Sequence, residues 1–300
     1  MSENRLKQAR LFLYLFSILL NFSFSRIVKP VNSDEAKIEL QSEALIVSGL
    51  YSKPRPFYAK LTYSSPKFFC GATIIEEQFV VTAARCVDHV GVSNVTLEVG
   101  PFWQVSPETV KYAVEAKFIS SSYIGGPRPL MDLALLKTVE PIRDARNKII
   151  PLCTQVSPES EHHYRMFGAA GMGSTSTSVN LYQFSVVLHE TFFFLSKYKT
   201  NSEHEMCRAD NVCTRPRFIE GSICHMDQGG PLYKFHCGSL VPECLYGVAS
   251  YWMTNPGLNS NETCNGGSYF ASVPVFYNWI NYHLSNYANR ETKKLIEMDL

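Results

Sequence analysis

The chain has 300 residues, 45% of them hydrophobic, and a formal net charge of +1. A charge so close to zero gives no electrostatic reason to expect nucleic acid or a membrane surface as a partner, so neither is expected. The length provides enough apolar side chains for one large or two small hydrophobic cores.

The first 25 residues are organised like a secretory signal. Basic residues stand near the start, residues 11–20 are apolar, and Ser23 and Ser25 offer small side chains at the usual cleavage spacing. A signal anchor is the alternative, but the apolar stretch 11–24 is shorter than the roughly 20 residues that span a bilayer. We therefore expect residues 1–25 to be a signal peptide and the protein to be secreted and extracellular.

Short strands are predicted beyond a polar, acidic-leaning stretch at residues 26–45. Apolar side chains alternate through residues 110–118, which is typical of a half-buried strand. Residues 73–75 and 79–82 read as two tightly joined strands, and 186–194 is a long β-branched and aromatic run. Many short strands with turn signals between them favour barrels or a sandwich.

The last element is predicted to be a helix. Pro274 suits a first helical turn, and apolar residues then recur at helical spacing as far as Leu284. Residues 286–300 mix charged and apolar side chains. Two interpretations of this tail stay open, a frayed or weakly amphipathic chain end and a partner-binding helix.

Four short motifs occur along the chain. They are Ile-Val-Ser-Gly at 46–49, Val-Val-Thr-Ala-Ala-Arg-Cys at 80–86, Asp-Leu-Ala-Leu-Leu at 132–136 and Cys-His-Met-Asp-Gln-Gly-Gly-Pro-Leu at 224–232. In this order and spacing they resemble the trypsin-like serine proteases. The resemblance implies an all-β fold of two packed six-stranded antiparallel Greek-key barrels with a short C-terminal helix. It also implies a propeptide-like segment at 26–45, a protease-like domain at 46–285 and a C-terminal tail at 286–300.

The resemblance places Arg85, Asp132 and Gln228 at the three catalytic positions. Gln228 stands where the family has its nucleophilic serine, yet a carboxamide nitrogen cannot be turned into a working nucleophile. Arg85 stands in place of the base histidine, yet a guanidinium stays protonated at physiological pH. Loss of such groups typically lowers turnover about a million-fold, so we expect no protease activity and no cofactor.

Two properties of the implied site remain open. Asp132 either pairs with the Arg85 guanidinium or is retained because it accepts hydrogen bonds from backbone amides. Met226 stands at the oxyanion position, where the family has Gly. Because Gly is favoured where φ is positive, Met226 makes a correctly oriented amide less expected.

The implied primary pocket also differs from that of trypsin. Ser222 stands where trypsin has an aspartate, so no anionic floor is expected to attract Lys or Arg. Tyr251 and Trp252 fall at the pocket entrance, and we expect Trp252 to crowd it. Gly267 belongs to the same implied pocket.

The resemblance makes Ile46 the equivalent of a mature N-terminus and Asp227 the residue that would receive it in an ion pair. Leu45 precedes Ile46 where the family has a basic residue. We therefore expect the chain to remain uncut here, which would leave Asp227 in need of another partner.

The nine cysteines indicate an oxidising compartment. The resemblance implies the bridges Cys70–Cys86 and Cys224–Cys264, and Cys207–Cys213 looks like a shortened form of a third. Cys237 and Cys244 have no family counterpart as a pair. Since they follow and precede two expected strands, 231–236 and 245–251, we expect a bridge across a hairpin. Cys153 is then left over, as a buried free thiol or an intermolecular link.

Two sequons, at Asn94 and Asn261, could carry glycans in a secreted chain. The neighbouring His162 and His163 raise the possibility of zinc. No cysteine or carboxylate spacing supports it, so we expect a solvated loop and no metal.

We expect a secreted, non-catalytic protease homologue that acts by binding a protein, either a protease or its substrate. Its role would be that of a regulator, decoy or cofactor of extracellular proteolysis. One alternative is a serine-type endopeptidase with residual hydrolytic activity, and another is a structural or storage protein of an extracellular secretion. A specific, saturable partner separates binding from storage.

Overall fold

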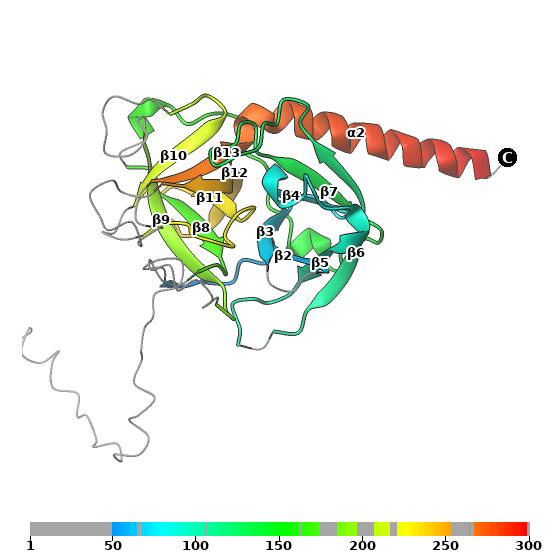
Figure 1. Ribbon diagram of the computed structural model, residues 1–300, viewed down its shortest axis with the longest axis horizontal. Helices are drawn as coiled ribbons and strands as arrows, with labels where there is room; N and C mark the ends of the chain where they lie inside the picture. Colours follow the sequence, from blue (N-terminus) through cyan, green and yellow to red (C-terminus); the bar gives the residue numbers. More distant parts are fainter. Residues whose placement is uncertain are drawn as a thin grey trace, which may run out of the picture. The chain divides into compact units, whose positions relative to one another are not determined.

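Figure 1 shows the computed structural model of the chain. All described residues lie in one compact unit, Glu43–Leu300. The described residues are 50–64, 68–105, 107–161, 164–174, 185–196, 207–216, 221–253, 264 and 267–298, with side chains described as far as Tyr287. The expected signal peptide, the propeptide-like segment, Ile46, the two neighbouring histidines and Asn261 lie outside these residues.

Six antiparallel strands close the first barrel, in the order β2-β3-β4-β7-β6-β5 (Figure 1). They are β2 (Tyr58–Tyr63), β3 (Phe69–Ile74), β4 (Phe79–Thr82), β5 (Val95–Val99), β6 (Val110–Ile119) and β7 (Ala134–Thr138). Three of the strands expected from the sequence, 73–75, 79–82 and 110–118, fall in or beside β3, β4 and β6. Every residue of β4 and β7 is buried, and β5 buries every second residue, so these strands supply much of the core.

The second barrel is also closed by six strands, in the order β9-β10-β13-β12-β11-β8, because β8 pairs with β9. They are β8 (Phe167–Gly171), β9 (His189–Ser196), β10 (Asn211–Pro216), β11 (Pro231–Phe235), β12 (Pro242–Trp252) and β13 (Ser268–Ser272). A two-residue strand, β1 (Leu50–Tyr51), adds to the outside of β9. The expectation of two six-stranded barrels is confirmed.

The expected C-terminal helix is α2 (Val273–Met298). Phe276 and Ile280 on its first turns are buried, and the Tyr287 hydroxyl donates to Glu115 of β6 at 2.7 Å. The helix therefore packs against the first barrel, and its backbone continues through most of the segment for which the sequence left a frayed tail open. No helix in the described part of the chain combines the length and apolar content that a membrane crossing requires.

Four short 3-10 helices lie in the connections. They are η1 (Ala84–Cys86), η2 (Val92–Asn94), η3 (Ala145–Asn147) and η4 (Glu159–Glu161). Asn94, the sequon residue that the structure describes, is exposed at the end of η2.

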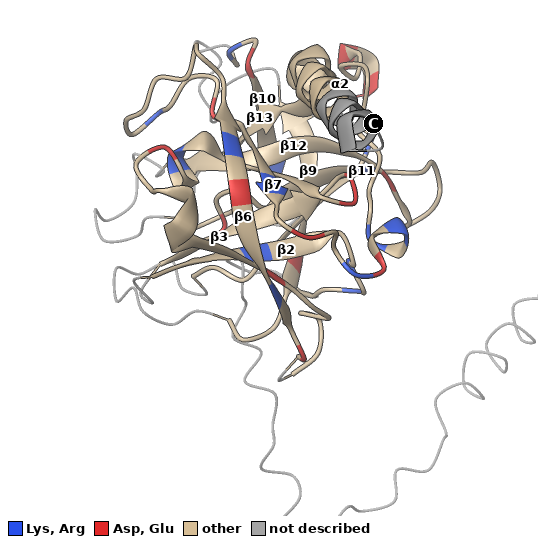
Figure 2. Ribbon diagram, turned by 90° about the vertical axis from the view of Figure 1, so that its right-hand side faces the viewer, with Lys and Arg blue, Asp and Glu red and all other residues tan. Residues whose placement is uncertain are grey.

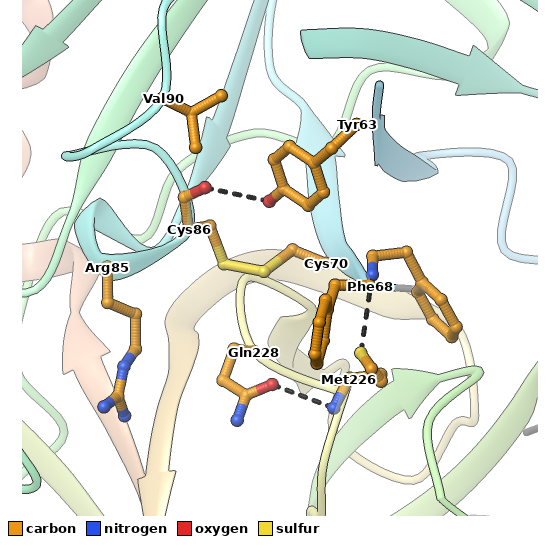
Figure 3. A pocket seen from close by; sticks show the side chains of 9 residues that line it. Tyr63, Phe68, Cys70, Arg85, Cys86, Val90, Met226 and Gln228 are labelled. Atoms are coloured by element: carbon orange, nitrogen blue, oxygen red, sulfur yellow. Dashed lines mark hydrogen bonds between the residues drawn. A yellow bond between two sulfur atoms is a disulfide. The ribbon is translucent and has the colours of Figure 1, made fainter. Parts of the chain in front are cut away.

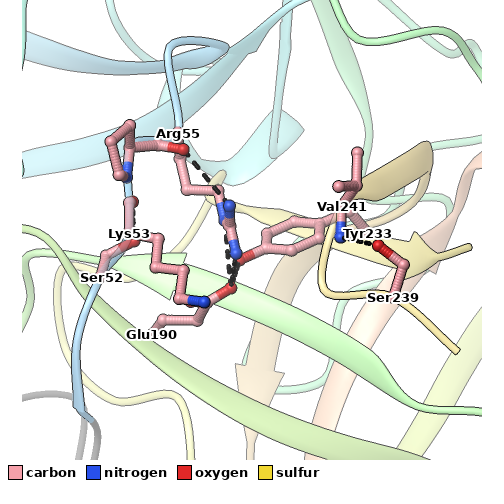
Figure 4. Close-up of polar contacts among 8 residues, drawn as sticks. Ser52, Lys53, Arg55, Glu190, Tyr233, Ser239 and Val241 are labelled. Atoms are coloured by element: carbon pink, nitrogen blue, oxygen red, sulfur yellow. Dashed lines mark hydrogen bonds and ion pairs between the residues drawn. The ribbon is translucent and has the colours of Figure 1, made fainter.

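A buried ion pair fixes the segment that leads from β1, beside the second barrel, to β2 of the first. The chain passes from β1 to β2 through Arg55, whose guanidinium lies 2.8 Å from the Glu190 carboxylate of β9 (Figure 4). Nε of Arg55 donates to the Tyr233 hydroxyl of β11 at 2.9 Å, and that hydroxyl donates to Glu190. Arg55 and Glu190 are only 4% and 3% exposed. Removing one partner would leave a buried charge unpaired, at a cost of roughly 3–5 kcal/mol.

Three of the four disulfides are the expected pairs, Cys70–Cys86, Cys207–Cys213 and Cys224–Cys264. The expected Cys237–Cys244 bridge is wrong, because Cys244 is bonded to Cys153 and Cys237 is an exposed free thiol. The register explains this, since Cys244 lies opposite Lys234 in the β11–β12 ladder, while Cys237 lies beyond the last paired residue. Residues 151–153 run beside β12, with Cys153 N donating to Leu245 O at 2.9 Å, and this places Cys153 next to Cys244.

We predict that replacing Cys153 and Cys244 together by Ala lowers the unfolding free energy by about 2–4 kcal/mol, because their bridge closes a long loop. Cys237→Ser, the matched control, should change it by less than about 0.5 kcal/mol, since its thiol is exposed. Urea denaturation measures both, and peptide mapping without reduction should recover a linked Cys153–Cys244 peptide. A linked Cys237–Cys244 peptide would contradict the pairing.

Candidate functional site

The site lies where the two barrels meet, and glycines allow the contact. Gly71 of β3 donates its backbone N–H to the carbonyl of Gln228 at 2.7 Å. A Cβ on Gly71 would lie 2.7 Å from the Cα of Gly230, and one on Gly229 would lie 2.2 Å from the Gly71 oxygen. Gly229 also has a φ of +80°. No larger residue fits at these positions without moving one barrel, so the backbone of Gln228 is fixed against β3.

Arg85 reaches the site from η1, which directly follows β4 and is anchored by the Cys70–Cys86 bridge. Its guanidinium donates to the carbonyl of Ser250 on β12 at 2.9 Å and to the carbonyl of Gly126 at 3.0 Å. No carboxylate of the described residues forms an ion pair with it. Arg85 thus connects the barrels through main-chain acceptors and keeps an unpaired positive charge.

Asp132 lies beneath Arg85 and is 2% exposed. Its carboxylate accepts from the Arg85 backbone N–H at 2.8 Å and from the Ser250 hydroxyl at 2.5 Å. Burial raises the pKa of the Asp132 carboxyl above its usual range, and the two hydrogen bonds oppose that rise. Of the two interpretations left open by the sequence, the structure shows the backbone contact and no ion pair between Asp132 and the Arg85 guanidinium.

Met226 does not turn its amide away from the site, which corrects the expectation drawn from its side chain. Its φ is +70°, a left-handed conformation that favours Gly, and its N–H donates to Oε1 of Gln228 at 2.9 Å. Its sulfur accepts from the Phe69 N–H at 3.4 Å, which helps to hold the side chain. The amide therefore faces the cleft, and the Gln228 carboxamide covers it.

An apolar pocket of about 400 Å³ opens beside these groups (Figure 3). Most of its wall is aromatic, aliphatic or sulfur-bearing, and its polar members are Arg85 and Gln228. It is lined by Tyr63, Phe68, Phe69, Cys70, Arg85, Cys86, Val90, Met226 and Gln228. Four of these residues, Tyr63, Phe68, Phe69 and Val90, were not predicted from the sequence, although two successive phenylalanines directly before Cys70 were a visible signal.

The residues implied in the primary pocket lie close together and carry no charge. The Ser222 hydroxyl donates to the Ile223 carbonyl and lies 3.0 Å from that of Ser268. Tyr251 stacks on Tyr269 with ring centroids 4.5 Å apart. A separate contact joins Trp252 to His225, edge to face at 4.6 Å.

Trp252 also packs against the Cys224–Cys264 bridge. A Cβ on Gly267 would lie 3.0 Å from the Tyr269 hydroxyl, so Gly267 has little room for a side chain. That Trp252 crowds the pocket entrance stays a prediction.

Asp227 is buried, and its carboxylate accepts from the N–H groups of Gly173 and Cys224 at 2.8 and 2.9 Å. No cation of the described residues forms an ion pair with it. Burial raises the pKa of Asp227 to about 7, against the opposing effect of the two amides.

Because the pKa of Asp227 is higher in the folded than in the unfolded chain, its contribution to stability is present at low pH and lost as pH rises through about 7. We predict that Asp227 alone contributes a fall of about 2–3 kcal/mol in the unfolding free energy between pH 5 and pH 8, measured as the difference between the wild type and Asp227→Asn. Asp227→Asn should remove this fall, although it lowers the overall stability. Urea titrations of both proteins at several pH values test this, and an equal pH dependence for the wild type and Asp227→Asn would contradict it.

We also predict that Gln228→Leu lowers the unfolding free energy by about 1 kcal/mol, because the Met226 N–H loses its acceptor. Gln228→Glu is the matched control. It keeps an acceptor of the same length and adds a charge beside Arg85, so its stability should equal or exceed that of the wild type. Equal losses for both variants would mean that the hydrogen bond contributes nothing.

Comparison with known proteins places this architecture in a family. The family model described as Trypsin matches residues 47–280. Azurocidin from Homo sapiens is 30% identical over 250 residues, covering 80% of this chain and 87% of azurocidin. Neutrophil elastase from Mus musculus is 28% identical over 246 residues, covering 79% and 81%. The structure of human heparin binding protein superposes with a TM-score of 0.62 at 26% identity, covering 80% of this chain and 97% of that one. The chain therefore belongs to the trypsin family.

Proposed function

We propose that this protein is a secreted, non-catalytic member of the trypsin family that acts by binding a protein. The observation that carries the proposal is the state of the two side chains that face the cleft. The Gln228 carboxamide bonds the Met226 amide, and the Arg85 guanidinium bonds the carbonyls of Ser250 and Gly126. Neither group can act as a nucleophile or take up a proton at physiological pH.

Other groups near the cleft do not replace the missing chemistry. The Ser250 hydroxyl bonds Asp132, but Ser250 is fully buried and cannot reach a substrate. His225 contacts Trp252 edge to face, and burial lowers the pKa of its imidazole. Triad chemistry requires an oxygen nucleophile within hydrogen-bonding distance of a base, and no such pair of described residues faces the cleft.

The binding role rests on what the cleft offers. The apolar pocket is open and is lined by aromatic side chains, a disulfide and two polar groups, a combination typical of sites that bind by shape and a few directed contacts. Similarity to human heparin binding protein raises a polyanion as a ligand. The near-neutral charge does not favour it, and basic and acidic residues alternate along β6 in Figure 2.

Extracellular residence is supported by the disulfides. Four bridges among the described residues are characteristic of an oxidising compartment. Together with the cleft, they favour a regulator, decoy or cofactor of extracellular proteolysis, which would bind a protease or its substrate without cleaving it.

The proposal predicts that the purified, secreted protein neither hydrolyses peptide libraries nor reacts with fluorophosphonates. Gln228→Ala is the matched control, because any trace activity that persists in it comes from a contaminant. Stoichiometric labelling of a serine in the wild type would instead make the protein a serine-type endopeptidase, and turnover that Gln228→Ala abolishes would show that this cleft catalyses hydrolysis.

Binding is tested with the same purified protein. The full secreted chain is immobilised, and extracellular fluid is the source of partners. A retained protein supports the proposal if its binding saturates, is competed by soluble wild type and is reduced when Val90→Trp fills the pocket. Retention that does not saturate would indicate a structural or storage role.

A further inference from the structure

Two side chains at the rim of the apolar pocket, those of Arg85 and Gln228, have more N–H groups than acceptors among the described residues. A guanidinium carries five N–H groups, and the structure directs Arg85 to two carbonyl acceptors and to no carboxylate of the described residues. The Met226 N–H requires an acceptor, which fixes Oε1 of Gln228 toward Met226 and turns its NH₂ group the other way. No described residue accepts a hydrogen bond from that NH₂ group, and Arg85 and Gln228 are both partly exposed.

Both side chains line the same pocket. In the view of Figure 3 the nitrogens of Arg85 and Gln228 point toward its lower edge, whereas Tyr63 and Val90 are drawn at the upper edge. A ligand that fills the pocket and satisfies both donors needs an acceptor group with negative charge directly beside a bulky apolar group.

We propose that this pocket binds the C-terminal residue of a polypeptide that ends in a large apolar side chain. The side chain enters the space between Phe68, Phe69 and Val90, and the terminal carboxylate accepts from Arg85 and from the Gln228 carboxamide. This inference rests on the proposed binding function and specifies the chemistry of the partner.

The size of the apolar pocket and the position of the polar donors beside it favour a C-terminal carboxylate over other carboxylates. The pocket, about 400 Å³, holds one large side chain and no more than a short piece of backbone. Since the polar and apolar parts border each other, the carboxylate must be attached close to the apolar group. In a C-terminal residue both are bonded to the same Cα. Proteolysis generates such ends, which connects the site to the proposed role in extracellular proteolysis.

The test measures binding of fluorescein-labelled peptides to the full secreted protein by anisotropy. The main probe is Gly-Gly-Ser-Gly-Ser-Phe with a free carboxylate. It is compared with the same peptide as its C-terminal amide, with a free-acid peptide ending in Ser, with an amidated peptide that carries Glu-Phe internally, and with unlabelled 3-phenylpropanoate as competitor.

The free acid ending in Phe should bind about 10- to 100-fold more tightly than its amide, because a charge-assisted hydrogen bond is lost in the amide. It should also bind at least about tenfold more tightly than the peptide ending in Ser, which has no apolar side chain to bury. Arg85→Gln should remove the preference for the acid over the amide. Arg146→Gln, an arginine that is 89% exposed on η3, is the matched control and should keep it.

Val90→Trp should weaken the binding of every peptide, because the larger side chain fills the pocket. If Val90→Trp does not fold, the comparison with Arg85→Gln still decides the test. Equal binding of acid and amide, or a preference that survives Arg85→Gln, would overturn the carboxylate site. Binding of the Glu-Phe amide or of 3-phenylpropanoate as tight as that of the free acid would replace the chain end by an internal acidic segment or a small acid. If no peptide binds while a saturable protein partner is retained without hydrolysis, this inference fails and the proposed function stands.

Discussion

The contact between the backbones of Gly71 and Gln228 determines the geometry of the rest of the site. The hydrogen bond of 2.7 Å and the lack of room for a Cβ on Gly71 or Gly229 hold β3 of the first barrel against the turn that precedes β11 of the second. This contact is made entirely by main-chain atoms. It therefore fixes where residue 228 lies whatever its side chain is, and a glutamine can occupy the position without disturbing the barrels.

The same constraint explains why Met226 keeps a left-handed backbone. A non-glycine residue in this region is disfavoured by roughly 1–2 kcal/mol. The surrounding turn is held by Gly71, by the Cys224–Cys264 bridge and by the bonds of Asp227, and Gln228 adds an acceptor for the Met226 amide. The Met226 side chain therefore did not predict the orientation of its backbone N–H, because the contacts of neighbouring residues fix that orientation.

The sequence was sufficient to predict the two barrels and three of the four disulfides, because four motifs in the right order resemble a family with that fold. The same resemblance drew attention to Arg85 and Gln228, which line one pocket, and to Asp132, which accepts from the Arg85 backbone. The sequence was insufficient for the Cys153–Cys244 bridge, which depends on residues 151–153 running beside β12, a long-range contact with no local pattern. The hydrogen-bond partner of Asp132 could not be predicted either, since an ion pair with Arg85 and a bond to a backbone amide are both compatible with the same sequence. The apolar pocket could not be predicted, because its lining residues lie far apart in the sequence and are brought together by the fold.

Burial determines which residues at this site can be substituted without loss of stability. Asp132, Ser250 and Asp227 are nearly or fully buried and bond one another or backbone amides, so replacing one would leave buried polar groups unsatisfied at about 1–3 kcal/mol each. Arg85 and Gln228 are partly exposed, and water can satisfy what they leave unpaired. The fold therefore tolerates different side chains at residues 85 and 228 better than at the buried positions. The side chains at these two positions are constrained mainly by what they contact in the cleft, so a ligand of the cleft would depend on them.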